Sequence, residues 1–289
     1  MSSLERLLSV LEVFTEQKPI WTLDDIVGCL GLSRSQAYRY VRELANSALL
    51  MPIGRSRFVL GPKIIALDRQ IRLCDPLLTA SQPIMRDSIQ RIGEGILTLS
   101  TLYRDRMMCI HQEPEAAPLK VSYSRGRMLP LFLGSTSRVI LAHIPERRLI
   151  ALFLKHRPEI SAAGLGEEWD EFRDRLREIR RAGVCVTHAA IDAGVICAAV
   201  PLFNGPNNII GAICLVRPDH GDALGPSTVT ILEHAARQIS AAVTALLAGD
   251  AWAPLPCAMV APAPPARRVR AGRAPAAEVA RLRARGSAR

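Results

Sequence analysis

The stretch that decides the fold is TLDDIVGCLGLSRSQAYRYVRELANSALLMPIGRSRFVL at residues 22–60. Thr22 precedes two aspartates, so its hydroxyl can accept a hydrogen bond at a helix start while the acids face the positive helix end. This helix is predicted to end at Gly31, because glycine readily adopts the left-handed conformation of a C-terminal cap. Ser33 and Gln36 form a Ser-x-x-Gln capping box that begins a second helix. Helix, short turn and helix, followed by a hairpin, is the order typical of a helix-turn-helix domain.

The second helix of this module has two faces with different chemistry. The positions expected in the core recur at helical spacing, at Ala37, Val41, Leu44 and Ala48. The opposite face is polar and basic, and the hairpin adds two arginines. In a helix-turn-helix domain the second helix enters the major groove, where such groups meet phosphates and base edges. The residues expected to contact DNA are Arg34, Ser35, Gln36, Tyr38, Arg39, Arg42, Arg55 and Arg57.

Positive charge is concentrated in the same segment. Residues 33–62 carry five arginines against one glutamate, a net +4, whereas residues 1–32 carry two basic against five acidic residues, a net −3. A solvated helix face is the ordinary explanation of such a run, but it leaves the hairpin arginines unexplained. The sequence therefore predicts double-stranded DNA as a partner.

Composition excludes several other classes of protein. With 289 residues and 49% hydrophobic content the chain can form one large or two ordinary domains. It has no apolar run of the roughly 18 residues that span a membrane, and its N-terminus predicts an amphipathic helix instead of a secretory signal. The seven cysteines are scattered singly. This odd set favours a reduced cytoplasmic interior over a disulfide framework or a zinc site, so no metal or other cofactor is expected.

The chain is predicted to contain four parts. They are a DNA-binding domain at residues 1–62, a linker helix at 63–76, an effector-binding domain at 77–248, and a tail rich in Ala, Pro and Arg at 249–289. The tail carries eight arginines against two acids, a net +6, within a formal charge of +10 for the whole chain. It lacks the apolar content that offsets ordering entropy, so we expect it to be disordered. Such a tail either binds phosphates nonspecifically or is simply solvated.

The third part combines strands with helices. Strands are expected at residues 95–102, 106–112, 119–124, 184–188, 195–204 and 208–218. Helices are expected at residues 77–92, 136–143, 146–154, 167–182 and 226–248. Antiparallel strands with helices on one side indicate an α+β domain of the kind that senses small molecules.

Three blocks of sequence resemble segments of one bacterial protein family. The first runs from LERLLSVLEVF through GLSRSQAYRYVREL to FVLGPKIIALD, the second is LPLFLGSTSRVILAHIP at residues 129–145, and the third is RAGVCVTHAAIDAGVICAAVPLFNGPNNIIGAICLV at residues 181–216. In this order they resemble IclR-type transcriptional regulators over residues 3–248. The resemblance implies a fold of the α+β class, with an N-terminal winged helix-turn-helix domain, a linker helix, and a C-terminal GAF-like mixed α/β domain that binds a small organic effector.

The resemblance also implies an effector-binding site. The matching positions are Gly134, Ser135, Thr136, Cys197, Cys214 and Val216. Amides and hydroxyls at a helix N-terminus suit a carboxylate. Cys214 and Val216 stand where small polar residues are common in the family, which favours a larger or more apolar effector such as an aromatic acid. Each candidate has a plainer alternative, because Ser135 and Thr136 could cap the following helix and the cysteines could be inert core thiols.

The sequence thus predicts a DNA-binding transcriptional regulator controlled by a small carboxylate, with an aromatic acid favoured. A homodimer is expected, because one winged helix covers few base pairs, and the family resemblance implies a homodimer or a homotetramer. No membrane contact is expected. The alternative is a cysteine-based redox-sensing regulator that uses Cys197 or Cys74, although the apolar strand around Cys197 offers no positive charge to favour a thiolate. An enzyme is not predicted, because the chain lacks a Gly-x-Ser-x-Gly elbow, a phosphate-binding Gly-rich loop and a His-Glu-x-x-His motif.

Overall fold

The computed structural model describes residues 2–54, 56–103, 106–114, 119, 121–122, 124–222 and 224–248. The expected tail at residues 249–289 and the expected DNA contact Arg55 lie outside the described residues. The chain divides into two compact units, the first reaching Asp75 and the second starting at Pro76. Each unit has its own core.

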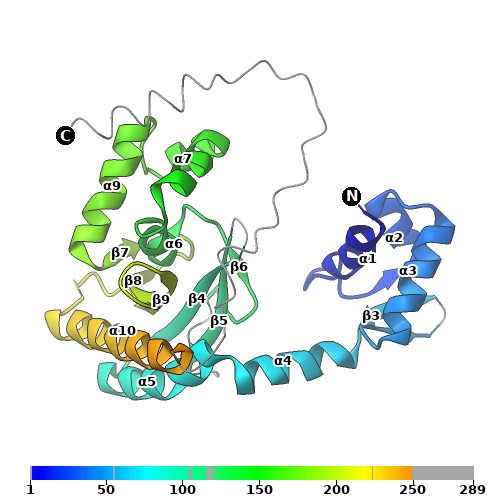
Figure 1. The fold of residues 1–289 in the computed structure, drawn as a ribbon, viewed down its shortest axis with the longest axis horizontal. Helices are drawn as coiled ribbons and strands as arrows, with labels where there is room; N and C mark the ends of the chain where they lie inside the picture. Colours follow the sequence, from blue (N-terminus) through cyan, green and yellow to red (C-terminus); the bar gives the residue numbers. More distant parts are fainter. Residues whose placement is uncertain are drawn as a thin grey trace. The chain divides into compact units, whose positions relative to one another are not determined.

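The first unit packs short helices against a small sheet (Figure 1). Its helices are α1 (Ser3–Glu12), α2 (Leu23–Leu30), α3 (Arg34–Asn46) and α4 (Pro62–Cys74). Its strands are β1 (Trp21–Thr22), β2 (Leu50–Ile53) and β3 (Arg57–Leu60), which are antiparallel in the order β1-β3-β2. Apolar side chains of α1, α2 and α3 form one core with Trp21 and Leu50. The helix-turn-helix and its hairpin are therefore a folded module of their own.

The predicted helix caps are confirmed. The Thr22 hydroxyl accepts from the Asp25 amide at 3.1 Å, and the Asp25 carboxylate accepts from the Thr22 amide at 3.0 Å. Gly31 ends α2 in the left-handed conformation, with φ of 60°. Ser33 and Gln36 make the same reciprocal pair of bonds at the start of α3. These local bonds fix the turn between the two helices.

The prediction that Ala48 faces the core as part of the second helix is wrong. Helix α3 ends at Asn46, and Ala48 is half-buried with φ of 58°, because the chain turns here to enter β2. The Ala48 carbonyl accepts from the Lys63 amide at 3.1 Å. A Cβ atom at Gly61 would lie 2.2 Å from that carbonyl oxygen, so this close approach requires glycine. The other positions of the predicted core set are buried.

The second unit is built on one antiparallel sheet. Its strands are β4 (Ile96–Tyr103), β5 (Arg106–Glu113), β6 (Met128–Leu129), β7 (Cys185–His188), β8 (Val195–Phe203) and β9 (Ile209–Pro218), in the order β6-β5-β4-β9-β8-β7. Its helices are α5 (Pro76–Ile92), α6 (Gly134–Leu141), α7 (Glu146–Lys155), α8 (Arg157–Ala162), α9 (Trp169–Ala182) and α10 (Pro226–Leu247). The mixed α+β class is therefore confirmed.

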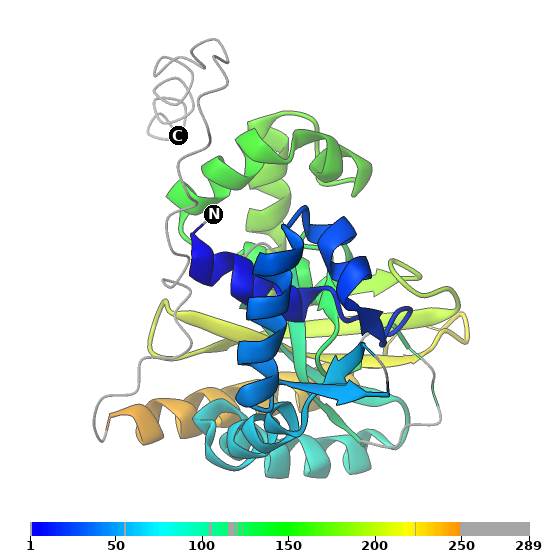
Figure 2. The same ribbon diagram turned by 90° about the vertical axis from the view of Figure 1, so that its right-hand side faces the viewer.

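Helices cover both faces of this sheet, so the expected one-sided cover is wrong. In Figure 1, α5 and α10 lie along one face while α6, α7 and α9 lie over the other, and Figure 2 again shows strands between two layers of helices. On β8, Cys197 and Ala199 belong to one core, whereas Ala198 and Val200 belong to the other. Because side chains alternate along a strand and both faces of β8 are apolar, both faces need cover.

The expected strand at residues 119–124 is also wrong in the part that the structure describes. Ser122 turns its backbone toward the loop before β8, where its amide donates to the Asp192 carboxylate at 2.7 Å. The edge of β5 instead pairs with β6 through Met107 and Leu129. Helix α8 was missed, because a six-residue helix carries too little periodicity to be recognised.

Candidate DNA interface and effector cavity

Two of the expected DNA-contacting arginines are held in surface ion pairs. Arg34 Nη1 lies 3.2 Å from Asp24 Oδ1, and both side chains are more than two-thirds exposed. Arg42 Nη2 lies 3.5 Å from Glu43 Oε1, again at the surface. Exposed pairs of this kind contribute only about 0–1 kcal/mol, so either arginine can leave its partner for a phosphate at little cost.

Arg39 has a different environment on the same face. Its guanidinium carbon lies 5.4 Å from the centroid of the Tyr40 ring. That ring is buried, and its hydroxyl lies 3.0 Å from Ser3 Oγ, a contact that lowers the pKa of Tyr40. Arg39 therefore extends from a fixed aromatic base, while its neighbours Ser35 and Tyr38 are exposed beside it. A guanidinium that extends from a fixed base suits paired contacts to a guanine edge.

Gln36 already has a structural role. Its side-chain oxygen accepts from both the amide and the hydroxyl of Ser33, each at 3.1 Å. The side chain is half-buried, and only its amide nitrogen is left for an outside partner. Gln36 is thus both a cap and a candidate DNA contact.

The hairpin places Arg57 at the start of β3, where it is exposed and stands opposite Thr22 on β1 and Ile53 on β2. One edge of the first unit thus combines a capped, basic helix with a short hairpin. This arrangement is the geometry of a winged helix-turn-helix DNA-binding domain.

In the second unit, one cavity brings together every residue proposed to bind the effector. The loop before α6 and the first turn of α6 form one side, and strands β4, β7, β8 and β9 form the other. The lining residues are Thr98, Leu129, Leu133, Gly134, Ser135, Thr136, Ser137, Thr187, Ala190, Ile191, Cys197, Cys214 and Val216. The cavity encloses about 20 Å³, which is room for roughly one water molecule.

Strand register explains why residues distant in sequence meet there. Thr187 stands opposite Cys197, and Cys197 stands opposite Val216, which forms a row across β7, β8 and β9. The neighbouring row contains Cys214 and Thr98, which stand opposite each other on β9 and β4. Side chains two residues apart share a face of the sheet, so both rows point toward α6.

Hydrogen-bond donors converge within this cavity. Hydrogen bonds with the Cys197 thiol and with the hydroxyls of Ser135 and Thr136 lower the pKa of Cys214, whose thiol also donates to the Leu215 carbonyl at 3.4 Å. The Ser135 hydroxyl lies 3.4 Å from that sulfur. Leu133 occupies the N-cap position of α6 and no side chain caps this helix, so the capping alternative for the two hydroxyls is not what the structure has. The cavity therefore points donors and the open end of a helix at one spot.

Thr187 is a cavity residue that the sequence analysis missed. Its hydroxyl is buried and makes no hydrogen bond to any described residue. A buried polar group without a partner costs about 1–3 kcal/mol, and in this position it points to a polar ligand or a water. The alternation of VCVTH could have placed Thr187 on the same face as Cys185, but its pairing with Cys197 could not be read from the sequence.

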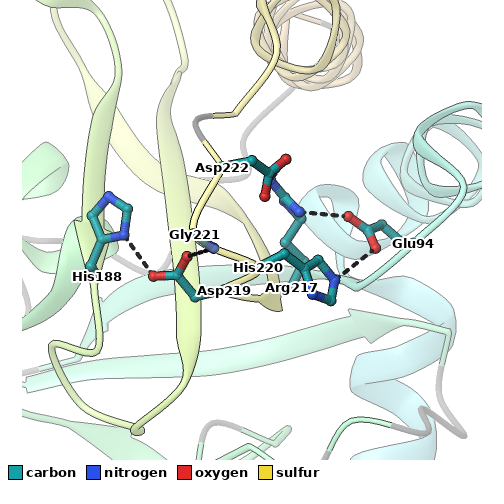
Figure 3. Close-up of polar contacts among 7 residues, drawn as sticks. All are labelled: Glu94, His188, Arg217, Asp219, His220, Gly221 and Asp222. Atoms are coloured by element: carbon teal, nitrogen blue, oxygen red, sulfur yellow. Dashed lines mark hydrogen bonds and ion pairs between the residues drawn. The ribbon is translucent and has the colours of Figure 1, made fainter.

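A network of charged groups holds the strand ends next to the cavity (Figure 3). Arg217, which follows the cavity residue Val216, is buried and donates to Glu94 at 2.9 Å and to Asp222 at 3.1 Å. His188, which follows Thr187, lies 2.8 Å from Asp219 and lowers its pKa. His220 lies 3.6 Å from Glu94 (Figure 3). These contacts tie β7, β9 and the start of β4 together, and so fix two walls of the cavity.

The other thiols that the structure describes show no second reactive group. Burial raises the pKa of Cys109 and of Cys185 to about 11, so neither is a thiolate at neutral pH. Cys197 is buried, whereas Cys74 is exposed. Within the described ranges no cluster of three or more His, Cys, Asp or Glu residues is placed to hold a metal ion, and no helix is long and apolar enough to cross a membrane.

Comparison with known proteins identifies the two domains. Residues 3–50 match the IclR helix-turn-helix domain, and residues 75–241 match the bacterial transcriptional regulator IclR C-terminal domain. The chain belongs to the IclR family. IclR proteins are transcriptional regulators that bind DNA through the helix-turn-helix domain and carry an effector-binding domain. The chain is therefore a DNA-binding transcriptional regulator of this family, and the curated relatives named below are regulators as well.

Individual IclR relatives are distant in sequence. The Pca regulon regulatory protein of Pseudomonas putida is 23% identical over 214 residues, covering 74% of this chain and 73% of the relative. The HTH-type transcriptional regulator XynR of Escherichia coli is 23% identical over 217 residues, covering 74% and 85%. Among solved structures, an IclR homolog from Microbacterium hydrocarbonoxydans complexed with 4-hydroxybenzoate aligns with a TM-score of 0.67 at 24% identity, covering 84% of this chain and 100% of that one. The regulator from Alicyclobacillus acidocaldarius aligns with a TM-score of 0.69 at 21% identity, covering 84% and 97%.

Proposed function

We propose that this regulator binds its operator through the exposed face of α3 and the β2–β3 hairpin, and that an aromatic carboxylate in the second-unit cavity controls this binding. The observation that carries the proposal is the cavity itself, which groups the hydroxyls of Ser135, Thr136 and Thr187 at the uncapped start of α6, beside the apolar Val216 and Ile191. A carboxylate can accept from the amides of the helix N-terminus and from the buried Thr187 hydroxyl, and an apolar body matches the remaining wall.

Arg39 is the residue we propose to read bases. Arg34 and Arg42 begin in ion pairs and suit phosphate contacts, which position a protein without reading sequence. Arg39 projects from the Tyr40 ring on the face between them. Ser35, Gln36, Tyr38 and Arg57 complete the proposed surface, together with Arg55.

The aromatic class is supported by the cavity and by one relative. Val216 and Ile191 give the cavity apolar walls, and the Thr187 hydroxyl leaves one buried group to be satisfied by a ligand. The similar structure from Microbacterium hydrocarbonoxydans was solved with 4-hydroxybenzoate, an aromatic carboxylate. These observations favour an aromatic acid over an acid of two or three carbons.

A second copy of the chain is the proposed partner of the first unit. Leu4 and Leu8 are one helical turn apart on α1 and are 74% and 56% exposed. On α4, Ile65 and Ile71 are 74% and 51% exposed, and every residue of this helix is exposed or half-buried. Apolar helix faces of this kind are covered in a homodimer or homotetramer, which also pairs two recognition helices on a palindromic operator.

Control of DNA binding then follows from linkage. An effector that binds one packing of the second unit more tightly favours that packing. We propose that α4 transmits the change to the spacing of the paired α3 helices, so that effector and operator alter each other's affinity by the same factor.

A thermal-shift screen of aromatic and aliphatic carboxylates tests the effector class, because a ligand that binds only the folded state raises the melting temperature. A carboxylate that raises the melting temperature is then tested on the Thr136→Val variant, which lacks the hydroxyl donor but keeps the side-chain shape. The matched control is Thr230→Val, at an exposed position of α10. We expect the ligand-induced rise to shrink for Thr136→Val alone. An equal rise in all three proteins would remove this cavity as the binding site.

A further inference from the structure

A larger groove lies beside the effector cavity and shares part of its wall. The groove has a volume of about 510 Å³, compared with about 20 Å³ for the cavity. Residues 128–133 line one side of it, and the segment from His156 through α8 lines the other. Leu129 and Leu133 line both spaces. These two side chains therefore form the partition between cavity and groove.

The groove has the chemistry of a small-molecule site. Its walls are mostly apolar, with Leu131 and Phe132 among them, and its polar groups are His156 and Glu159. The His156 ring lies 5.6 Å from the Phe132 ring, and its Nδ1 lies 3.1 Å from the Glu159 carboxylate. This contact lowers the pKa of Glu159 and keeps it ionised. Volumes of about 300–1,000 Å³, apolar walls and a few fixed polar groups are typical of ligand pockets.

The cavity alone is too small for the proposed effector. About 20 Å³ accommodates roughly one water, so an aromatic ring needs space from a neighbouring region. Of the two partition residues, Leu129 is buried, with 7% of its surface exposed, whereas Leu133 is only half-buried. Leu133 also directly precedes Gly134, where the proposed carboxylate contacts begin. A half-buried leucine can change between staggered rotamers more readily than a fully buried one.

We propose that Leu133 is the size gate of the effector site and that the groove behind it accommodates the apolar body of the effector. The carboxylate binds at Gly134–Thr136, the Leu133 side chain rotates aside, and the ring extends toward Phe132 and His156. This inference rests on the proposed function and adds to it. It assigns a ligand class, an aromatic carboxylate that is longer than the enclosed cavity, and names the residue that selects its length.

Benzoate and 2-naphthoate are suitable probes, because they differ by one fused ring. Their dissociation constants are measured by calorimetry on the full chain, and the ratio of the two is compared among variants. Leu133→Ala opens the partition and is expected to favour 2-naphthoate over benzoate by about tenfold relative to the unchanged protein, which corresponds to about 1.4 kcal/mol. Ala162→Phe fills the groove from an exposed position of α8, away from the core, and is expected to shift the ratio the opposite way.

Leu154→Ala is the matched control, since Leu154 is 40% exposed on α7 and lines neither space. If the ratio of the benzoate and 2-naphthoate dissociation constants is unchanged in both Leu133→Ala and Ala162→Phe, Leu133 is not a gate. The proposal of an aromatic effector would still stand. If Leu133→Ala fails to fold, the ratio of dissociation constants measured for Ala162→Phe alone tests the gate. Binding of neither probe to any of these proteins would overturn the aromatic effector class and the gate together.

Discussion

The α3 surface and the α6 cavity both present polar side chains, but under opposite physical conditions. On α3 the arginines are exposed, and Arg34 and Arg42 sit in ion pairs that contribute little to folding. At the start of α6, Ser135 and Thr136 are buried, and their hydroxyls bond to a buried sulfur. A change on α3 should therefore alter binding alone, whereas a change in the cavity should alter binding and stability together.

The largest expected effect is that of Thr136→Trp, which fills the cavity. Overpacking of a buried site costs about 1–3 kcal/mol, so the second unit should melt at a lower temperature. We also expect the effector response to disappear while operator binding persists. Thermal melts and gel shifts with and without ligand measure both effects. A retained response would place the effector elsewhere, and Thr230→Trp on the exposed side of α10 controls for bulk.

Arg39→Ala is the corresponding change on the open surface. If Arg39 contacts a guanine, its removal should weaken operator binding by about 1–3 kcal/mol and relax base choice at one position. The melting temperature should not change, because the side chain is exposed. Fluorescence anisotropy at fixed salt measures the loss, with Arg175→Ala at an exposed position of α9 as the control. Equal losses in the two variants would show only a general effect of charge.

Gln36→Glu separates capping from DNA contact at one residue. Glutamate serves in a capping box as well as glutamine, so α3 should remain as stable. A new negative charge beside a phosphate opposes binding by about 1 kcal/mol for unit charges 4 Å apart in water. We expect operator affinity to fall about fivefold at an unchanged melting temperature. A fall in melting temperature with normal DNA binding would assign Gln36 to the cap alone.

The smallest expected effect is a dependence of folding stability on pH. Hydrogen bonds from Thr22, and then from Lys18, lower the pKa of Asp25 to about 2 from its ordinary value near 3.8. A lowered pKa in the folded state gives stabilisation that is present above about pH 4 and is lost as the pH falls toward 2. Asp25→Asn should therefore melt below the unchanged protein at pH 5, with the difference narrowing by pH 2. A difference that does not vary with pH would show that the charge has no part in the cap.

The sequence predicted local structure well, because local bonds determine it. The caps at Thr22 and Ser33 and the stop at Gly31 each depend on residues within three positions, and all are present. It also named six of the thirteen residues that line the cavity, but only through the family resemblance. Periodicity alone could not bring Gly134 next to Cys197 and Cys214, because that contact depends on strand order in the sheet.

Non-local competition explains the errors. Residues 119–124 alternate like a strand, yet the described residues of this segment do not pair with the edge of β5. Strand β6 pairs there instead, with Met107 and Met108. Thr187 was missed because one threonine in a short strand has no local signature. The one-sided helix cover was wrong because alternating apolar residues on β8 contribute to both cores. In each case, a distant segment decides which neighbour a residue meets.

Hydrogen–deuterium exchange of the full chain, with and without a duplex selected from random sequence, tests whether α3 and the hairpin contact DNA. We expect slower exchange in α3 and in β3 when the duplex is bound, and no such change in α9, which lies in the second unit. Unchanged exchange in α3 and β3, together with full affinity of Arg39→Ala for the same duplex, would contradict this contact.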